Sequence, residues 1–380
     1  MTWQDRAAKL AARILYPHSR WWNAVTTTPR HLLIPRWFDW DEEAEGWQLR
    51  DGPSDERAWM AAVYTGQTRV TRVGAVHADH AEPGRTYPGW PTSSSTAPGL
   101  VVAMYRHAHI YDGADVLDVG TGTGYGCALL TRRLGAGHVT SIDVDPYLTR
   151  IAAERLDTIG IHPAILTADA TAELPGSYDR IVPMMSAPRI PASWLTALRP
   201  GGRLVFSLAG TSALITANKT PDGGAAGQVE WYPASFMTAR HGTDCPSPLD
   251  GMFKEIRDAE GEHVSQGKYP VLNVTWGWEL DVVLGVTVPG VVHRYKHDEK
   301  TGTETAWMLH EDGSWARASG TENEAPIVHQ SGPRRLWDTL DDIRHHWVAN
   351  GALPVRGADV EVDPDGTCHL SKGKWNATIR

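Results

Sequence analysis

The chain has 380 residues, a formal net charge of −9, 41% hydrophobic residues and 21% charged residues. This length allows two or more domains with a sizeable core, and the composition excludes disordered, collagen-like and fibrous proteins. A nucleic-acid-binding protein needs an electropositive face that neutralises phosphates, so the negative charge disfavours a nucleic-acid partner.

The cysteines and the apolar runs indicate the compartment. Cys127, Cys245 and Cys368 lie far apart and form no C-x-x-C pair, so neither a disulfide framework nor a cysteine zinc site is predicted. The first residues lack the apolar run of a signal peptide, and no apolar stretch of about 18 residues, long enough to cross a bilayer, occurs. We expect a cytoplasmic protein with no membrane partner.

Residues 1–91 are expected to form an N-terminal lobe of helices and irregular segments. The stretch from Val63 to Val70 reads as a strand. Apolar residues at helical spacing behind a Thr2 cap predict an amphipathic first helix. These residues are Trp3, Ala7, Leu10 and Ile14.

Residues 92–242 are expected to form the core, an α/β doubly wound sheet. Short apolar runs alternate there with helical stretches, which is typical of a parallel sheet with helices on both faces. The turn-rich segment 218–228 predicts an antiparallel hairpin that ends the sheet. The five apolar runs begin at Val116, Val139, Ala164, Arg180 and Arg203.

Residues 243–380 are expected to form an appended C-terminal α+β region. We predict a strand over 271–286, a hairpin around 310–315, and a helix that begins at Pro333 and ends at Asn350–Gly351. The apolar face of this helix comprises Leu336, Leu340, Ile343 and Trp347.

The strongest motif is VLDVGTGTGYG, from Val116 to Gly126. A buried strand ends in an acid, and glycines then let the backbone turn tightly so that a ligand can approach the amides at the start of a helix. Taken alone, this motif does not separate a nicotinamide cofactor from S-adenosylmethionine, nor either from a merely tight turn.

Acidic residues after the next two strands extend the pattern. Asp143 ends the second strand, where a carboxylate can accept both ribose hydroxyls, while Asp145 is expected to face solvent or cap the following helix. Asp169 follows the third strand, beside the expected adenine, although a solvated loop aspartate is the alternative. LRPGGRLVFSL from Leu198 completes a series that resembles class I methyltransferases.

That resemblance implies a Rossmann-like fold that binds S-adenosylmethionine and releases S-adenosylhomocysteine. The cofactor-binding residues that it implies are Asp118, Gly120, Thr121, Gly122, Gly124, Asp143, Val144, Asp169 and Ala170.

The segment after the fourth strand, 182–186, lacks the N-P-P-Y-like tetrad of nucleobase methyltransferases. The segments 91–98, 23–35 and 184–191 instead resemble the protein-L-isoaspartate O-methyltransferase family. The resemblance implies that Thr96, with Ser95 in reserve, is the active-site hydroxyl residue. It places Ser94, Met185 and Ser186 at the substrate. The alternative is that the Ser/Thr cluster only caps the helix that starts at Pro98.

The C-terminal segment GPRRLWDTLDDIRHHWVANGALP and the residues after it resemble actinobacterial homologues encoded with graspetide, lanthipeptide and lasso-peptide precursors. This implies a peptide partner, an aspartate of which is esterified and then closes to an aspartimide, and a C-terminal region that recognises the peptide. Two alternatives are a repair enzyme for isoaspartyl residues and a non-catalytic scaffold that holds the precursor.

The expected chemistry needs no strong base, because an aspartate with a pKa of about 3.9 is already ionised at neutral pH. The histidine pairs lack a nearby third ligand in the sequence, so no metal is expected. The chain has 17 Trp against 4 Phe. Most of these tryptophans are expected in the core, with the hypothesis that some line a groove for the peptide.

Overall fold

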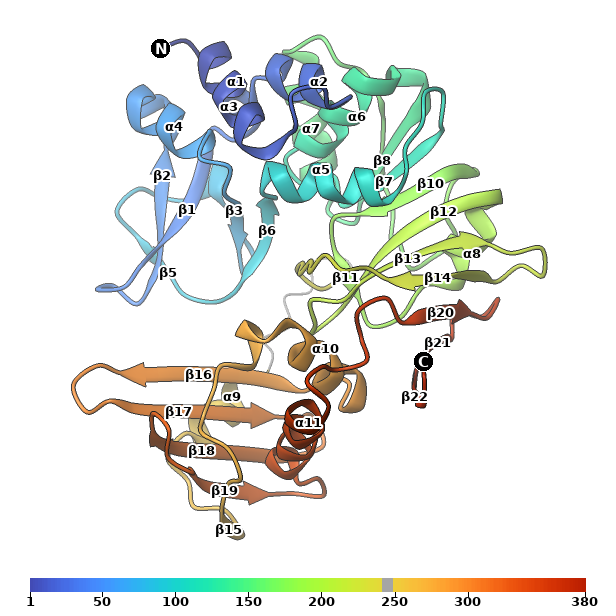
Figure 1. The fold of residues 1–380 in the computed structure, drawn as a ribbon. Coiled ribbons are helices and arrows are strands. Elements are labelled where there is room, and N and C mark those ends of the chain that lie inside the picture. Colours follow the sequence, from blue (N-terminus) through green and yellow to red (C-terminus); the bar gives the residue numbers. More distant parts are fainter. Residues whose placement is uncertain (241–248) are drawn as a thin grey trace.

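The structure is a computed structural model that describes residues 1–240 and 249–380, so Cys245 and the expected boundary at 242/243 lie outside the described residues. Figure 1 shows an N-terminal lobe in blue, a central sheet in cyan to green and a C-terminal lobe in orange. Within these ranges, no helix is both long and apolar enough to cross a bilayer.

The N-terminal lobe consists of short helices and a small antiparallel sheet, and its first helices share a hydrophobic core with helices of the central region. Its elements are α1 (Trp3–Ile14), α2 (Trp22–Thr27), α3 (Arg30–Leu33), β1 (Arg36–Asp41), β2 (Gly46–Asp51), α4 (Glu56–Val63), β3 (Arg69–Val73), β4 (Val76–His77), β5 (Thr86–Tyr87) and β6 (Pro91–Ser95). The sheet has the order β4-β3-β1-β2-β5, and β6 also pairs with β3. The strand that carries Ser94 and Ser95 therefore belongs to the N-terminal sheet, across the expected 91/92 boundary.

The first helix is confirmed, since Thr2 Oγ1 accepts the Asp5 N–H and the Thr2 N–H donates to the Asp5 carboxylate. The strand expected over 63–70 is wrong for most of its length. Helix α4 ends at Val63, Gly66 turns with φ +87°, and β3 begins only at Arg69. The turn interrupts the run before extended backbone can form.

The central sheet is the expected doubly wound α/β core. Its elements are α5 (Pro98–His107), β7 (Val116–Val119), α6 (Tyr125–Leu134), β8 (Val139–Asp143), α7 (Pro146–Asp157), β9 (Ala164–Thr167), β10 (Tyr178–Pro183), β11 (Ser186–Ala187), α8 (Ala192–Ala197), β12 (Leu198–Leu208), β13 (Leu214–Lys219) and β14 (Ala225–Val229). The parallel strands run β9-β8-β7-β10-β12, so the chain order reverses between β7 and β10. Ligands of such sheets bind at the carboxyl ends of the strands at this switch point. The expected hairpin is present as β13 and β14, but the expectation that it ends the sheet is wrong, because β14 also pairs with a later strand, residues 359–362.

The C-terminal region divides between two sheets. Its elements are α9 (Asp250–Ile256), β15 (His263–Gln266), α10 (Trp278–Thr287), β16 (Val292–Asp298), β17 (Thr303–Leu309), β18 (Trp315–Thr321), β19 (Ile327–Ser331), α11 (Leu336–Asn350), β20 (Asp359–Val362), β21 (Cys368–Lys372) and β22 (Trp375–Ile379). Strands β15 to β19 form an antiparallel sheet of their own, whereas β20 pairs with β14 and extends the central sheet.

Helices α10 and α11 join the two sheets into one hydrophobic core. Leu280 of α10 and Leu340 of α11 are fully buried in a cluster that includes Phe206 of the central sheet and Met308 of the C-terminal sheet. The C-terminal lobe therefore shares its core with the central sheet.

The strand expected over 271–286 is wrong, because this segment contains α10. Its apolar residues are buried on every side and lack a readable period, and a short buried helix then looks like a buried strand. The hairpin around 310–315 is confirmed as β17 and β18. The last helix is also confirmed, although it begins at Leu336 rather than Pro333; it ends at Asn350, and Gly351 follows as its C-cap with φ +72°.

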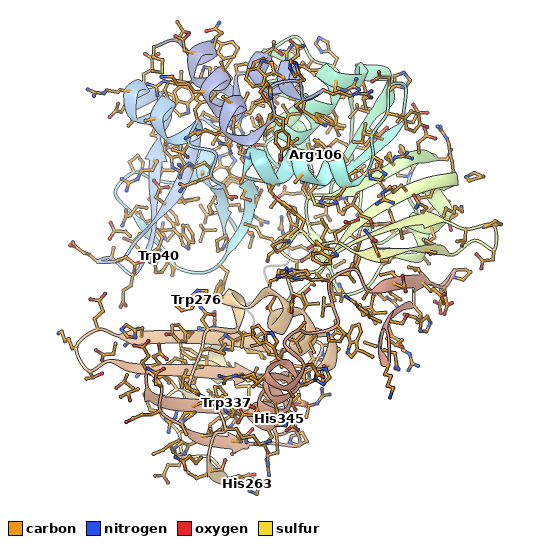
Figure 2. All side chains as sticks on the ribbon, viewed as in Figure 1. Trp40, Arg106, His263, Trp276, Trp337 and His345 are labelled. Carbon is orange, nitrogen blue, oxygen red and sulfur yellow. The ribbon has the colours of Figure 1, made fainter. Side chains whose placement is uncertain are left out.

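Most flanking tryptophans are buried or half-buried, as expected for core residues. Trp40, Trp90 and Trp276 are the exposed ones in the described flanks, at 44%, 47% and 76%. In Figure 2, Trp40 lies on the N-terminal lobe and Trp276 on the C-terminal lobe, on the sides that face each other. Among the flanking tryptophans that the structure describes, only these three are therefore candidates for lining a peptide groove.

Candidate active site

The glycine loop between β7 and α6 lies at the switch point of the central sheet. Gly120, Gly122 and Gly124 have φ values of +92°, +51° and +83°, a region that residues with a side chain rarely adopt. A Cβ on Gly122 would also lie 3.2 Å from the carbonyl oxygen of Ser94. The loop thus needs glycine both for its backbone conformation and for the close approach of the N-terminal lobe.

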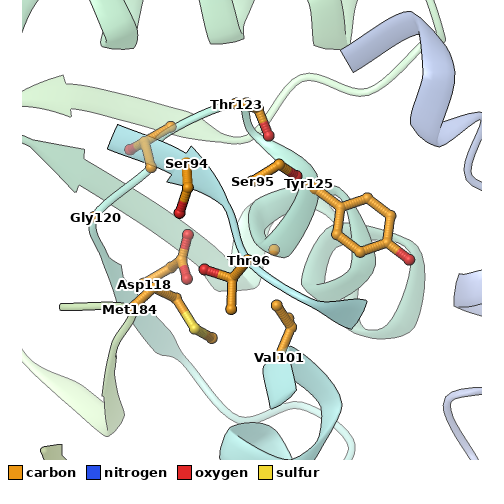
Figure 3. Close-up of a pocket in the computed structure, with 11 residues that line it drawn as sticks. Ser94, Ser95, Thr96, Val101, Asp118, Gly120, Thr123, Tyr125 and Met184 are labelled. Carbon is orange, nitrogen blue, oxygen red and sulfur yellow. The ribbon is translucent and has the colours of Figure 1, made fainter. Parts of the chain in front are cut away.

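A pocket lies between this loop and the strand β6 (Figure 3). Its enclosed volume is about 20 Å³, far below the ~300–1,000 Å³ of typical small-molecule sites, so the pocket as it stands has room only for a water-sized group. The structure brings together several predicted residues here, namely Ser94, Ser95, Thr96, Asp118, Gly120 and Thr121. Two lobes of the protein build this pocket, the N-terminal one supplying the hydroxyls and the central one the acid.

Asp118 is a buried acid in the wall of the pocket. Its carboxylate accepts hydrogen bonds from Ser141 Oγ at 2.8 Å and from Tyr105 Oη at 3.4 Å. Burial penalises the charged form and raises the pKa of Asp118 to about 7, against the partial compensation of these hydroxyl donors. A cationic ligand group in the pocket would be stabilised by this carboxylate.

The Ser/Thr segment presents hydroxyls to the pocket. The Ser95 side chain is buried, and its Oγ has no hydrogen-bond partner among the described residues. An unpartnered buried hydroxyl is costly, so a ligand that completes its hydrogen bonding fits this position. In Figure 3 the Thr96 hydroxyl points toward Asp118.

The alternative that the Ser/Thr cluster caps the next helix is wrong. The N-cap of α5 is Ala97, and no side chain accepts a hydrogen bond there. Pro98 occupies the first turn, where its missing N–H needs no partner. The hydroxyls are therefore not used to stabilise the helix.

Asp143 lies at the end of β8 and holds the glycine loop. One oxygen accepts the Gly122 N–H at 2.9 Å and the other accepts the Asp145 N–H at 3.1 Å. Burial raises the pKa of Asp143. Val144, the next predicted cofactor residue, is half-buried. Asp145 caps α7 as expected, by accepting the Tyr147 N–H.

Asp169 and Ala170 lie in the loop after β9. Asp169 accepts hydrogen bonds from the backbone and the hydroxyl of Thr171 at 2.8 and 2.7 Å, and the Ala170 carbonyl accepts the Trp194 indole N–H. The loop is thus a structured turn. Both residues lie outside the group that lines the pocket.

The predicted substrate residues separate in the structure. Ser94 lines the pocket, whereas Ser186 is buried and donates its hydroxyl hydrogen bond to the Phe236 carbonyl. Met185 packs against the hydrophobic core, and its neighbour Met184 lines the pocket instead. Both methionines lie in the bend between β10 and β11, which turns their side chains to different surroundings.

Some pocket residues were not predicted. Tyr125 and Gly126 are the last two residues of the glycine motif, which is the signal that could have found them. Thr123 lies in the same motif, whereas Val101 carries no signal of this kind, because it reaches the pocket through the packing of α5.

The switch-point pocket, glycine loop and strand order define the class of this fold, that of class I S-adenosylmethionine-dependent methyltransferases, as expected. The glycine cradle, the buried Asp118 carboxylate and the unpartnered Ser95 hydroxyl fit the cationic, amino-acid-bearing cofactor of this class. Within the class, residues 89–235 match the sequence model of the family "Protein-L-isoaspartate(D-aspartate) O-methyltransferase (PCMT)".

Named relatives agree with this match. The protein-L-isoaspartate O-methyltransferase of Ignicoccus hospitalis is 35% identical over 135 residues, which are 34% of this chain and 64% of that protein. The enzyme of the same name from Pyrococcus horikoshii is 33% identical over 114 residues, or 29% of this chain and 51% of that protein. The chain thus spans about half to two thirds of the length of these relatives.

A solved structure named protein-L-isoaspartate O-methyltransferase aligns with 97% of this chain and 99% of its own, at a TM-score of 0.52 and 15% identity. This likeness concerns the fold alone. It covers more of the chain than residues 89–235 and includes the C-terminal region.

Proposed function

We propose that this protein is an S-adenosylmethionine-dependent O-methyltransferase that esterifies a carboxylate derived from aspartate in a peptide or protein. The observation that carries the proposal is the position of Ser94, Ser95 and Thr96 at the rim of the glycine-loop pocket. These are neutral hydroxyl donors, which suit an acceptor that arrives already ionised.

The chemistry that the cofactor supplies when bound is an electrophilic methyl group on a sulfonium. Asp118 is placed to stabilise the cationic part of the ligand. Thr96 and Ser95 donate hydrogen bonds that orient the acceptor carboxylate, while Met184 and Val101 help to exclude water. Because no proton must be removed from the acceptor, orientation supplies most of the catalysis, and orientation can contribute about 7–11 kcal/mol.

The narrower proposal is that the acceptor is an ordinary aspartate in a constrained, ribosomally made peptide. The ester would then lose methanol when the next backbone amide nitrogen attacks its carbonyl carbon, which leaves an aspartimide. The C-terminal resemblance supports this substrate. The names of the relatives support the alternative, an isoaspartyl residue in a damaged protein.

A role for the C-terminal lobe in peptide recognition has one structural support. Trp90, the residue before β6, donates its indole N–H to Asp250 of α9 at 2.9 Å. Arg294 of β16 lies over the Trp90 ring, 5.4 Å from its centroid, and pairs with Asp250. The C-terminal lobe therefore contacts the residue that immediately precedes the strand with the hydroxyls.

Mass spectrometry of three acceptors tests both levels of the proposal. The protein is incubated with S-adenosylmethionine and a cyclised precursor peptide, its linear form, or an isoaspartyl peptide. Gain of a methyl followed by loss of methanol only on the cyclised peptide supports the narrower proposal. Turnover of the isoaspartyl peptide alone supports the repair alternative, and methylation of none contradicts the enzyme proposal.

The scaffold alternative is separated by one substitution. Asp143→Ala removes the carboxylate that holds the Gly122 and Asp145 amides. Methylation should be abolished if the protein is an enzyme. If it is a scaffold, delivery of the peptide to another enzyme should survive the substitution.

A further inference from the structure

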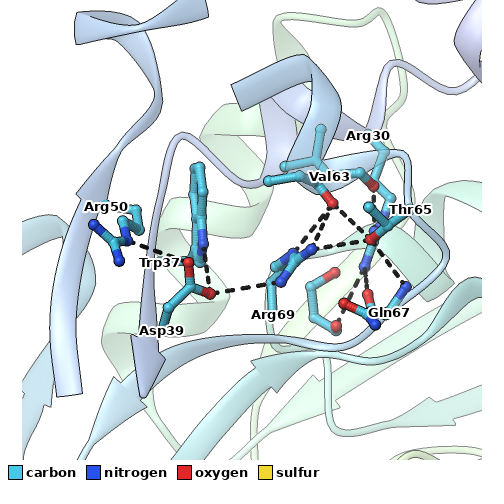
Figure 4. Close-up of polar contacts among 10 residues, drawn as sticks. Arg30, Trp37, Asp39, Arg50, Val63, Thr65, Gln67 and Arg69 are labelled. Atoms are coloured by element: carbon cyan, nitrogen blue, oxygen red, sulfur yellow. Dashed lines mark hydrogen bonds and ion pairs between the residues drawn. The ribbon is translucent and has the colours of Figure 1, made fainter. Parts of the chain in front are cut away.

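Arg30, in the short helix α3, is a fully buried arginine that bonds to backbone next to the pocket. Its guanidinium donates to the carbonyl oxygens of Val63, Gln67, Ser95 and Thr96, the last three at 3.1, 3.3 and 3.4 Å. Figure 4 shows Arg30 with two of these acceptors, Val63 and Gln67, and the neighbouring Arg69. One side chain thus connects the turn after α4 with the end of β6.

The charge of Arg30 also faces the glycine-loop helix. Its guanidinium carbon lies 5.3 Å from the centroid of the Tyr125 ring, at the first residue of α6. Burial lowers the pKa of Arg30 to about 10, which still leaves the side chain cationic at neutral pH. The cation is stabilised by carbonyl dipoles and by the aromatic ring.

The hydrogen bonds from Arg30 to the Ser95 and Thr96 carbonyls hold the two peptide planes on either side of the Thr96 Cα atom. The Ser95 carbonyl belongs to the plane before this atom and the Thr96 carbonyl to the plane after it, and each plane is rigid. The second plane is also held at its other end, since the Ala97 N–H donates to Thr68 Oγ1 at 3.0 Å. Two fixed planes determine the direction of the Cα–Cβ bond, and hence the position from which the Thr96 hydroxyl reaches the pocket.

We infer that Arg30 is a positioning residue for methyl transfer, which holds the Ser95–Thr96 backbone so that the Thr96 hydroxyl meets the acceptor carboxylate. The expected effect on kcat rests on the proposed function, whereas the expected effect on the Ser95–Thr96 backbone does not. Lysine is not equivalent to arginine here, because one ammonium cannot occupy the positions of both Nη1, which donates to Val63, and Nη2, which donates to the other three carbonyls.

Arg30→Lys tests the inference against Arg203→Lys as a matched control. Arg203 is a buried arginine that donates to the His107 carbonyl and pairs with Glu230, away from the residues that line the pocket. We expect Arg30→Lys to lower kcat at least tenfold and to change the affinity for S-adenosylmethionine less than twofold. Arg203→Lys should keep kcat within threefold of the wild type, whatever its melting temperature.

A double-mutant cycle with Thr96→Val separates positioning from general damage. If Arg30 acts through the Thr96 hydroxyl, Arg30→Lys lowers kcat less than threefold in the Thr96→Val background. A full tenfold loss in that background, or a wild-type kcat of Arg30→Lys alone, overturns the inference.

Hydrogen exchange decides the structural part independently of any acceptor. Amides of the segment 93–97 should exchange at least tenfold faster in Arg30→Lys than in the wild type, and at the wild-type rate in Arg203→Lys. Unchanged exchange overturns the inference even if activity falls. If the wild-type protein methylates no acceptor, the proposed function is contradicted. Hydrogen exchange then still decides whether Arg30 holds the segment 93–97.

Discussion

Ser141 Oγ donates a hydrogen bond of 2.8 Å to Asp118 Oδ2 and thereby joins neighbouring strands β8 and β7 at the wall of the pocket. The same hydroxyl lies 2.7 Å from Thr121 Oγ1 in the glycine loop. The Asp118 carboxylate is thus fixed by neutral hydroxyls, including that of Tyr105. Its negative charge suits a cationic ligand.

Cofactor affinity should depend on pH through Asp118. The pKa of this carboxyl is raised to about 7, so in the empty pocket it is mostly protonated below that pH. A cationic cofactor favours the ionised form, so its affinity should rise with pH up to about 7 and level off above. Below about pH 7, the affinity for the cofactor should fall by up to about tenfold for each pH unit. Calorimetric titration with S-adenosylmethionine between pH 5.5 and 8.5 measures this.

Asp118→Asn is the control for the pH dependence. It should bind the cofactor weakly and equally at all these pH values. The folded wild type binds more protons than its unfolded chain between about pH 4 and 7, so this group makes stability fall as pH rises through that window, and the substitution should remove this slope. An unchanged pH dependence of affinity in the variant would show that another group titrates.

Gly122→Ala should destroy cofactor binding. Its Cβ would meet the Ser94 carbonyl at 3.2 Å, and its φ of +51° is unfavourable for alanine by about 1–2 kcal/mol. Gly113→Ala is the matched control, because its φ is +84° and nothing lies within 4 Å of the added atom. Both variants should lose stability in urea titrations, and Gly122→Ala at least as much as Gly113→Ala because of the added contact. Loss of cofactor affinity in both, or in neither, would contradict a specific role for the close approach.

The parallel strands and the glycine loop could be predicted because their signals are local. The buried apolar run that begins at Val116, the acid Asp118 and the glycines all lie between Val116 and Gly126. This short segment alone is enough to predict the strand, the turn and the start of the helix. Arg30 could not be assigned in this way, because its burial depends on β6 and the turn after α4, which lie far along the chain. The pairing of β20 with β14 is likewise set by an open sheet edge, which no local pattern reports.

The Thr96 hydroxyl should matter more for catalysis than the Ser95 hydroxyl. Thr96→Val keeps the shape of the side chain but removes the donor, so kcat should fall about 10–100-fold, the equivalent of about 1.4–2.7 kcal/mol. Thr96→Ser should retain most activity. Ser95→Ala removes an unpartnered buried hydroxyl, so it should raise stability by about 1 kcal/mol. A larger loss of kcat in Ser95→Ala than in Thr96→Val would assign the main role to Ser95.

Leu280→Ala should destabilise the central and C-terminal sheets together. Leu280 is fully buried in α10, in the cluster that contains residues of both sheets. The cavity that the substitution leaves costs about 2–5 kcal/mol of stability. Tryptophan fluorescence reports both regions, and cofactor binding reports the central sheet alone. Because the core is shared, the two signals should decline in one transition at a lower urea concentration than in the wild type. Val264→Ala, at a 59% exposed position on β15, should change stability by less than about 0.5 kcal/mol. Loss of fluorescence in two steps, with cofactor binding retained through the first, would show that the C-terminal lobe unfolds separately and that the shared core does not couple the sheets.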